Sequence, residues 1–468
     1  MSREIRPDYQ QQFLLPPSLD EWVSSDHPVR FVRDFVEMLD LPALGFRAGL
    51  SEDEAGRTPY ASSMLLMVWV FGWMERVRSS RALEKACVRD VAFLWLTGNH
   101  HPDHNTLWRF FRNHKSALRK LFKQVVQLSV EAGLVGFVEH ALDGTKIGAA
   151  SSTRSALHRP TLVRKLAKLD AIVDEAIAQI EAAQAAGTEP RYPMPEAMLD
   201  VQDRRRMVLQ GLARLDEEQV NHLHESEPEA AMMKAGTRNT LAFNAQIVVD
   251  AKSDLIVAQE VVNDATDYAQ LVPMVEQVKD NTGAQAQETL ADSGYFSGEP
   301  LSQAEEKSLD VLVRPKADRD ENSPFHKSRF CYDAQRDGYV CPRGEFLPLE
   351  VLRRPGKSLR YAQATYRCKN ADCPVRTDCT DDKQGRTVVR GQHEEAMERA
   401  RQRFLAPGAE QRYRHRAAIV EHLFGIAKAI DGFRRFTVRG LVGARAQWAL
   451  LCTAINLRKL YLRWRLAT

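Results

Sequence analysis

Residues 136–146 read GFVEHALDGTK, and this stretch sets the fold class. Its apolar residues predict a buried strand, which we expect to end at Asp143. Residues 288–295, ETLADSGY, repeat the arrangement, with a short apolar strand expected to end at Asp292. Acidic side chains at strand ends can reach a shared cleft, although a single aspartate is more often an ordinary turn or capping residue. The two stretches together predict an α/β fold with both aspartates near one site.

A third stretch carries a glutamate on a predicted helix. Residues 420–428 read VEHLFGIAK, and Glu421 and Lys428 are seven residues apart, so two helical turns place them on one face. Arg414 lies seven residues before Glu421 and extends this stripe, while Gly425 predicts close packing against a neighbour. A surface ion stripe is the plain alternative. Two aspartates and a glutamate that converge can hold two divalent cations, which support the cutting and joining of phosphodiester bonds.

The pattern along the chain predicts five parts. Residues 394–430 keep helical periodicity, and apolar residues from 162 to 180 recur at the heptad-like spacing of a packed helix. Gly187, Pro190 and Pro195 are expected to end that helix before a second one begins. The parts are a helical region at 1–135, a mixed α/β core at 136–150, 236–315 and 386–440, a helical hairpin at 151–235, a Cys-rich insertion at 316–385 and a C-terminal helix at 441–468.

Charge is strongly segregated, although the net charge is only +3. Residues 399–468 contain 15 Arg and Lys, 13 of them Arg, against three acids, so this tail carries about +12 and the rest about −9. An arginine-rich tail suits contact with phosphate, because guanidinium binds phosphate oxygens bidentately. A solvated helical surface is the alternative.

Two observations bear on the compartment. Residues 1–7 lack the apolar segment of a signal peptide, and the longest apolar run, 64–73, is too short to span a bilayer. A cytoplasmic protein without membrane contact, and with reduced thiols, is therefore expected.

Reduced cysteines that cluster predict metal binding. Cys341, Cys368, Cys373 and Cys379 lie in the polar, loop-rich insertion at 316–385. Four thiolates that close into a tetrahedral site can bind a structural zinc ion and stabilise a segment that lacks a core. Free thiols are the equal alternative.

A turn and a basic helix occur within residues 1–135. Residues 102–106, PDHNT, predict the turn, and residues 107–112, LWRFFR, predict a helix in which Arg109 and Arg112 alternate with aromatics. Helix, turn and basic helix are compatible with a reader of the DNA major groove. A helical bundle with aromatics in its core is the alternative.

Taken together, these segments resemble the DDE transposases of bacterial insertion sequences, in the group with a Tyr-Arg-Glu-Lys signature. Residues 143–146, DGTK, are similar to the first catalytic segment of that family and residues 292–296, DSGYF, to the second. The third segment matches Tyr413, Arg416, Glu421 and Lys428. Residues 79–81, 95–98 and 102–106 resemble the amino-terminal DNA-binding region, and the Cys-rich insertion is similar to one found in this group.

One position departs from the signature. The family places Arg four residues before Glu, where this chain has Ala417. Arg416 lies five residues before Glu421, about 140° round the helix, whereas Arg414 has the better facing angle. Either arginine can therefore serve the signature role.

The resemblance implies an RNase H-like mixed sheet flanked by helices, an all-α N-terminal DNA-binding domain, and helical-hairpin and Cys-rich insertions. Asp143, Asp292 and Glu421 would hold two Mg²⁺ ions, with Mn²⁺ as a substitute. The implied reaction is cleavage at the ends of an insertion sequence and transfer of the 3′-hydroxyl into target DNA. DNA contacts would come from Arg109, Arg112, Lys146, Tyr413, Arg414, Arg416 and Lys428. Implied partners are terminal inverted repeats, target duplex and a second copy of the chain, in a bacterial, nucleoid-associated setting.

Two other functions fit parts of the sequence. A catalytically inactive DNA-binding regulator derived from a transposase shares the helical start and the basic tail, but it does not need all three acids. A metal-dependent phosphohydrolase acting on small molecules needs the acids, but neither a basic tail nor a region that binds DNA ends.

Overall fold

The computed structural model describes residues 18–47, 59–152, 157–186, 196–217, 219, 222–224, 226–235, 238–317, 322–356 and 361–467. Its mixed α/β character confirms the predicted fold class. Gly187, Pro190 and Pro195, the predicted breakers of the hairpin helix, lie outside the described residues.

The N-terminal region is helical, as predicted. It contains η1 (Leu19–Trp22), α1 (Pro28–Glu37), α2 (Leu41–Leu44), α3 (Ser62–Met74), α4 (Ser80–Arg89), α5 (Val91–Thr97), α6 (His104–Asn113) and α7 (Lys115–Glu131). Helix α3 is buried from Leu65 to Met74, which fits its almost unbroken apolar sequence. Helix α6 begins three residues before the predicted start, because the Asp103 side chain accepts a hydrogen bond from the Thr106 N–H and caps it.

Six strands form the main sheet in the described part of the chain. They are β1 (Glu139–Gly148), β4 (Ala231–Ala235), β5 (Arg238–Asp250), β6 (Ile256–Val262), β7 (Glu288–Ala291) and β8 (Val311–Val313). Strand β5 runs antiparallel to β1 on one edge, while β4 and β6 pair with different parts of its other edge. Strands β7 and β8 are parallel to β1, in the order β1-β7-β8.

One strand boundary differs from the prediction. Strand β1 does not end at Asp143 but continues to Gly148, because its pairing with β5 extends from His140 opposite Asp250 to Gly148 opposite Ala242. Strand β7 does stop at Ala291, immediately before Asp292, as predicted.

The helices beside the sheet are α10 (Leu271–Thr282), α11 (Gly298–Glu306), α13 (Glu394–Leu405) and α14 (Ala409–Gly425). The prediction of one helix over 394–430 is wrong, because Pro407 and Gly408 separate α13 from α14 and proline cannot continue a helix. A π-helical turn, Ile426–Ile430, extends α14 and carries Lys428. Such turns are rare and recur at functional sites.

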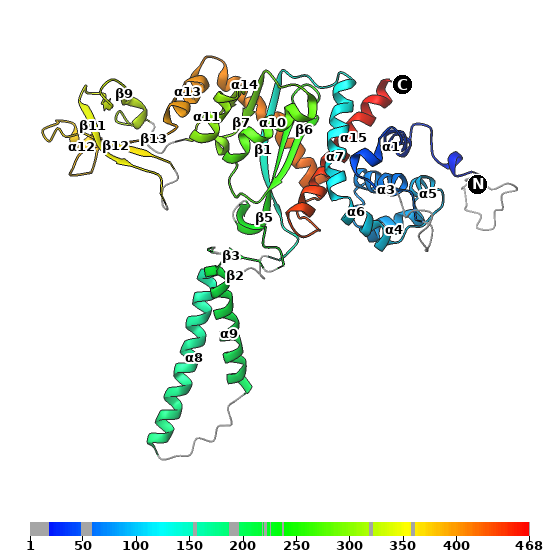
Figure 1. Cartoon of the computed structure of the whole chain (residues 1–468), viewed down its shortest axis with the longest axis horizontal. Helices are drawn as coiled ribbons and strands as arrows, with labels where there is room; N and C mark the ends of the chain where they lie inside the picture. The colour runs from blue at the N-terminus through cyan, green and yellow to red at the C-terminus, as the bar shows by residue number, and fades with distance from the viewer. Residues whose placement is uncertain are drawn as a thin grey trace, which may run out of the picture.

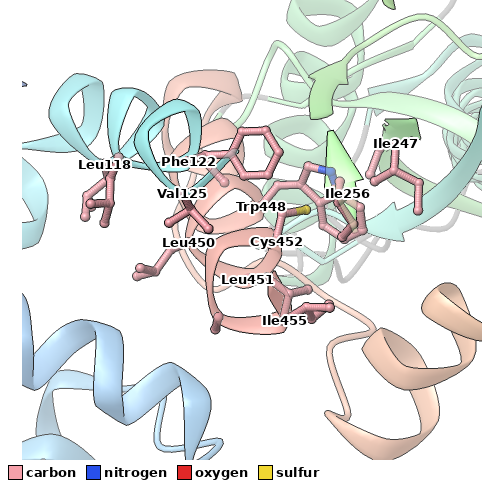
Figure 2. Packing of buried hydrophobic residues seen from close by; sticks show 14 of the residues in the cluster. Leu118, Phe122, Val125, Ile247, Ile256, Trp448, Leu450, Leu451, Cys452 and Ile455 are labelled. Atoms are coloured by element: carbon pink, nitrogen blue, oxygen red, sulfur yellow. The ribbon is translucent and has the colours of Figure 1, made fainter. Parts of the chain in front are cut away.

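Helix α15 (Leu441–Ala467) lies between the N-terminal helices and the sheet, and packs against α3, α7 and β6. Figure 2 shows Trp448, Cys452 and their neighbours beside Phe122 of α7 and Ile256 of β6. Trp448, Leu451, Cys452 and Ile455 form the core face that helical spacing predicts for α15, and all four are buried. One continuous hydrophobic core therefore joins both regions.

Two insertions leave the sheet. Helices α8 (Arg159–Ala185) and α9 (Glu196–Glu217) form the predicted hairpin, with a short ladder of β2 (Leu157–His158) and β3 (His222–Leu223) at its base. Figure 1 shows the hairpin projecting far from the rest of the molecule.

The Cys-rich segment lies beyond α13, at the end of the molecule opposite the N-terminal helices (Figure 1). Its elements are η5 (Lys327–Arg329), β9 (Cys331–Asp333), β10 (Gly338–Val340), β11 (Phe346–Arg353), β12 (Gln363–Arg367), α12 (Arg376–Cys379) and β13 (Thr387–Gly391). The expectation of an insertion without a core is wrong, since the side chains of Phe330, Tyr339, Leu347, Tyr366 and Val388 form a small one.

Across the described ranges, none of the helices combines the length and apolar character needed to cross a bilayer.

Candidate active site

Strands β1 and β7 bring Asp143 and Asp292 side by side. Leu142 pairs with Ala291 in the parallel ladder, and the two aspartates are the residues that directly follow this pair, Asp143 within β1 and Asp292 just beyond the end of β7. Each carboxylate is fixed locally: Asp143 accepts a hydrogen bond from the Gly144 N–H at 2.7 Å, and Asp292 accepts one from the Gly294 N–H at 2.8 Å. Adjacent strands lie about 4.8 Å apart, so these residues face a common space.

Asp143 is held in an unfavourable environment for a negative charge. Burial raises its pKa most, the charge of Arg416 works in the opposite direction, and the neighbouring Asp292 raises the pKa further. Asp143 and Asp292 are both half-buried, and two such carboxylates repel each other unless a cation lies between or beside them. The pair therefore has the electrostatic character of a cation-binding site.

Arg416 of α14 supplies a positive charge. Its Nη1 lies 2.8 Å from Asp143 Oδ2, and its Nη2 lies 3.9 Å from Glu421 Oε1. Arg414 instead pairs with Glu410 at 2.9 Å on the exposed side of the helix. The structure therefore places Arg416, and not Arg414, against the acids, because the length of the Arg416 side chain compensates for its facing angle. Contact of either arginine with DNA stays a prediction.

Glu421 lies on the solvent side of Arg416. Its side chain is 64% exposed, and its Oε1 atom lies 3.9 Å from Nη2 of Arg416, the same residue that contacts Asp143. Among the residues that the structure describes, no group of three or more acidic, histidine or cysteine side chains has the arrangement of a metal site. The structure thus brings the two aspartates together and places Glu421 next to them, across a guanidinium group.

Two predicted lysines also lie here. Lys428, on the π-helical turn, donates a hydrogen bond to the Thr145 hydroxyl. Burial lowers the pKa of Lys428, and the Asp143 charge partly opposes this effect. Lys146 points to the same region and pairs with Asp267 at 3.0 Å.

The close packing expected of Gly425 is wrong, since no atom lies within 4 Å of where its Cβ would be.

Asp267 is the site residue that the sequence did not reveal. It follows β6 in a polar loop, where an aspartate resembles an ordinary turn residue. The available signal was the pair Asn244 and Gln246 on β5, whose side chains are fully buried and both donate to Asp267. Buried amides on a strand require such a partner.

Tyr413 contacts Arg416 through its ring. Its ring packs edge-on against Phe404 at 5.4 Å, and the guanidinium carbons of Arg314 and Arg416 lie 5.6 and 5.8 Å from its centre. Tyr413 therefore helps to orient Arg416.

A second polar surface lies on the N-terminal helices. Arg109 and Arg112 are exposed on α6, as a DNA-contacting role requires. The starts of α4 and α6 border a cavity of about 350 Å³, lined by Ser79, Ser80, Arg81, His104, Asn105 and Trp108.

Much of the basic tail is paired within the chain. The pairs are Arg399 with Glu305, Arg401 with Glu394, Arg403 and Arg412 with Glu288, Arg445 with Glu260, Arg458 with Asp431, and Lys459 with Asp254. The charges that are segregated along the sequence are therefore largely neutralised in the fold, and the free phosphate-contacting surface is smaller than the tail's charge suggests.

The four predicted zinc ligands are free thiols, and within the described part of the chain they do not form a group arranged to hold a metal ion. Burial raises the pKa of Cys379, Arg386 opposes this, and the nearby Cys341, Cys368 and Cys373 raise it further. A tight turn presents Cys341: Gly344, at φ +85°, donates its N–H to the Cys341 carbonyl at 2.8 Å, and the Arg343 N–H donates to Cys341 Sγ at 3.3 Å.

Comparison with protein families decides the relationship. A family described as "Transposase DDE domain" matches residues 340–461, and one described as "Transposase domain (DUF772)" matches residues 17–113. Both matches confirm the resemblance to the DDE transposases. The first match includes Arg416, Glu421 and Lys428 of this chain, and the second includes Arg109 and Arg112.

Two further comparisons complete the picture. The chain is similar to a solved chain described as a piggyBac transposase synaptic complex with hairpin DNA, at 10% sequence identity and a TM-score of 0.33. That similarity covers 93% of this chain and 71% of the other. None of the curated proteins matches the sequence.

Proposed function

We propose that this chain cleaves DNA at the ends of an insertion sequence and transfers the resulting 3′-hydroxyl into target DNA, with Asp143, Asp292 and Glu421 as its catalytic acids. The observation that carries the proposal is that Asp143 and Asp292 directly follow the paired residues Leu142 and Ala291 of adjacent strands, together with an arginine that contacts both Asp143 and Glu421.

The strand order supports an RNase H-like core for the proposed catalytic domain. Strands β6, β5 and β1 are neighbours in antiparallel array, and β7 and β8 follow β1 in parallel. We assign this core to residues 136–150, 236–315 and 386–440. The helical DNA-binding domain at 1–135, the two insertions and the C-terminal helix are the remaining proposed parts.

The acids fit a divalent cation in chemical type. Oxygen ligands from carboxylates are what Mg²⁺ and Mn²⁺ prefer, and a half-buried like-charged pair gains most from a cation. Two such ions, when bound, stabilise the attacking and leaving oxygens of phosphodiester exchange. Arg416 can give up its ion pair with Asp143 and neutralise a DNA phosphate instead. Lys146 and Lys428 then hold the DNA backbone beside that phosphate.

DNA ends would be bound by α6 and the basic residues that face outward. Arg109 and Arg112 contact the terminal inverted repeats, and Tyr413 and Arg414 border the path to the acids. Two ends have to be held together, so the active form is proposed to be a homodimer on double-stranded DNA, in the bacterial nucleoid.

The direct test is a cleavage assay on a duplex that carries the end of the element. Mg²⁺ or Mn²⁺ should release a free 3′-hydroxyl at the end, and a chelator should prevent it. Binding should weaken steeply with salt, because phosphate contacts release counterions. Absence of cleavage with either ion, while end binding persists, would contradict the catalytic proposal.

That outcome would support the second candidate, a DNA-binding regulator without catalysis. One observation favours a regulator without catalysis. Arg416 is already ion-paired with Asp143, and Glu421 is exposed on the other side of the guanidinium group.

Metal binding should depend on pH. A cation and a proton compete for Asp143, and the pKa of Asp143 is raised. As the pH is lowered, affinity for Mn²⁺ should therefore begin to fall while the pH is still above about 3.9, the ordinary aspartate value. A raised pKa also means that Asp143 favours folding at low pH and that this contribution is lost as pH rises. The increase in melting temperature caused by Mn²⁺ should therefore grow as pH rises above the ordinary aspartate value of about 3.9. An increase that is independent of pH would contradict this.

A structural zinc ion is proposed for Cys341, Cys368, Cys373 and Cys379, since thiolates are its preferred ligands. Purified protein should contain about one zinc per chain, and Cys368→Ser should lose it and melt at lower temperature. Cys331→Ser is the matched control, because Cys331 is exposed on β9 and outside the proposed set. Zinc content that stays the same in Cys368→Ser would exclude the site.

A further inference from the structure

The helical hairpin has an open apolar groove. The groove, of about 1020 Å³, lies between α8 and α9 near their base, and Met207, which is 68% exposed, lines it. Ile172, at the centre of α8, is 46% exposed. Figure 1 shows that the hairpin projects away from the sheet and from the N-terminal helices, so neither covers these side chains. Exposed apolar residues on a projecting arm are typical of a surface that binds another protein.

Charge along α8 divides at its centre. The half next to β2 is basic, and the half that leads to the tip of the hairpin is acidic. The basic residues are Arg159, Arg164, Lys165 and Lys168. The acidic residues are Asp170, Asp174, Glu175 and Glu181. A helix with opposite charges in its two halves attracts a second copy of itself that runs in the opposite direction.

Lys168 and Glu175 are available for contact with another molecule. Both are exposed, and neither forms an ion pair with another described residue. By contrast, Arg205 is paired with Asp170 at 2.6 Å, in a different groove of the hairpin. Within the described part of the chain, the charged residues that line the groove beside Met207 are all basic: Lys165, Lys168, Arg204 and Arg214. An occupant of this groove is therefore expected to carry acidic residues.

Lys168, Ile172 and Glu175 form one stripe along α8. Lys168 and Glu175 are seven residues apart, so two helical turns place them on the same face, with Ile172 between them. Their midpoint falls between residues 171 and 172, at the centre of α8. A second α8 that crosses this midpoint in the opposite direction therefore places its Glu175 against Lys168 and its Lys168 against Glu175. A parallel second helix would instead bring like charges together.

We propose that the hairpins of two copies of this chain pack antiparallel across a two-fold axis beside Ile172, with two Lys168–Glu175 ion pairs between them. The same patch then meets itself, as a two-fold interface requires. Burial of Ile172 and Met207 supplies most of the affinity, because exposed ion pairs contribute little, and the charges select the direction. A DNA duplex fits less well, since the acidic half of α8 repels phosphate. The inference rests on the proposed function, in which two copies act together, and adds where they meet.

The test is sedimentation velocity of the full chain, without DNA or metal, over a dilution series. The parent chain should form a dimer, and Lys168→Glu and Glu175→Lys should each weaken it by about tenfold or more, because each creates two like-charged contacts. The double variant Lys168→Glu/Glu175→Lys should restore the dimer, since both ion pairs form again with their signs exchanged. Asp174→Lys is the matched control and should leave the dimer intact. It makes the same change of charge, but Asp174 is turned about 100° from Glu175 and lines the other groove.

Ile172→Lys provides a second test at the two-fold axis. It places two like charges side by side and should abolish the dimer, whereas Val163→Lys should not. Val163 is 51% exposed but lies nine residues before Ile172, on the opposite side of α8. Melting curves report whether each variant is folded.

A monomeric parent chain, single charge reversals without effect, or a double variant that stays monomeric would overturn the inference. Cleavage of an end-bearing duplex is measured separately. A dimer that does not cleave DNA would therefore contradict only the proposed function.

Discussion

Asp143→Asn is expected to abolish metal-dependent cleavage of an end-bearing duplex while end binding persists. The substitution keeps the shape of the side chain but removes the charge that a divalent cation requires. Metal ions supply several kcal/mol of stabilisation to the transition state, so a loss of about a thousandfold in rate is expected. Binding should persist because Arg109 and Arg112 lie on α6, away from β1.

Cleavage is measured as release of the 3′-hydroxyl strand, and binding as a gel shift at fixed salt. Asp280→Asn is the control, because Asp280 is an exposed acid at the end of α10. Retained cleavage in Asp143→Asn would remove Asp143 from the mechanism. Loss of both activities would be informative only with a melting curve that shows a folded protein, and Asp292→Asn then provides the repeat.

Asp431→Ala is expected to cause a large loss of stability. The Asp431 side chain is fully buried, and Arg458 contacts both of its oxygens at 3.1 Å. Arg76 lies 3.3 Å away, and Arg78 donates to its backbone carbonyl. Removing the carboxylate leaves these cations without a buried counter-charge, which should lower the free energy of unfolding by about 3 kcal/mol.

The measurement is urea unfolding followed by circular dichroism. Asp34→Ala is the control, since Asp34 is 57% exposed and pairs with its neighbour Arg33 on α1, so a change below about 1 kcal/mol is expected. Because Asp431 ends the π-helical turn of Lys428, cleavage in Asp431→Ala should fall more than its end binding. Equal stability of the two variants would show that the arginines find other partners.

The main elements were predictable because their signals are local. The apolar strand before Asp292, the β5–β6 hairpin and helices α3 and α10 follow from spacing over a few residues. The end of β1 was not predictable, since the strand is extended by pairing with β5, about a hundred residues later in the chain. Likewise, the aromatic core of the Cys-rich insertion comes from residues scattered between 330 and 388.

The site was predictable only in part, for a related reason. The acid-bearing segments stand out because each combines an apolar run with a charge. The choice between Arg414 and Arg416 depends on where a long side chain ends, which a helical wheel does not describe. Asp267 was not predictable, because an aspartate in a polar loop resembles a turn residue and the alternation along β5 does not show that Asn244 and Gln246 are both buried.

The position of α15 has a consequence for how the molecule is made. The N-terminal helices and the sheet that carries Asp143 both complete their apolar contacts on residues 441–467. Until the ribosome has translated that segment, α3, α7 and β6 have an uncovered hydrophobic face. A fragment truncated near residue 135 should therefore aggregate.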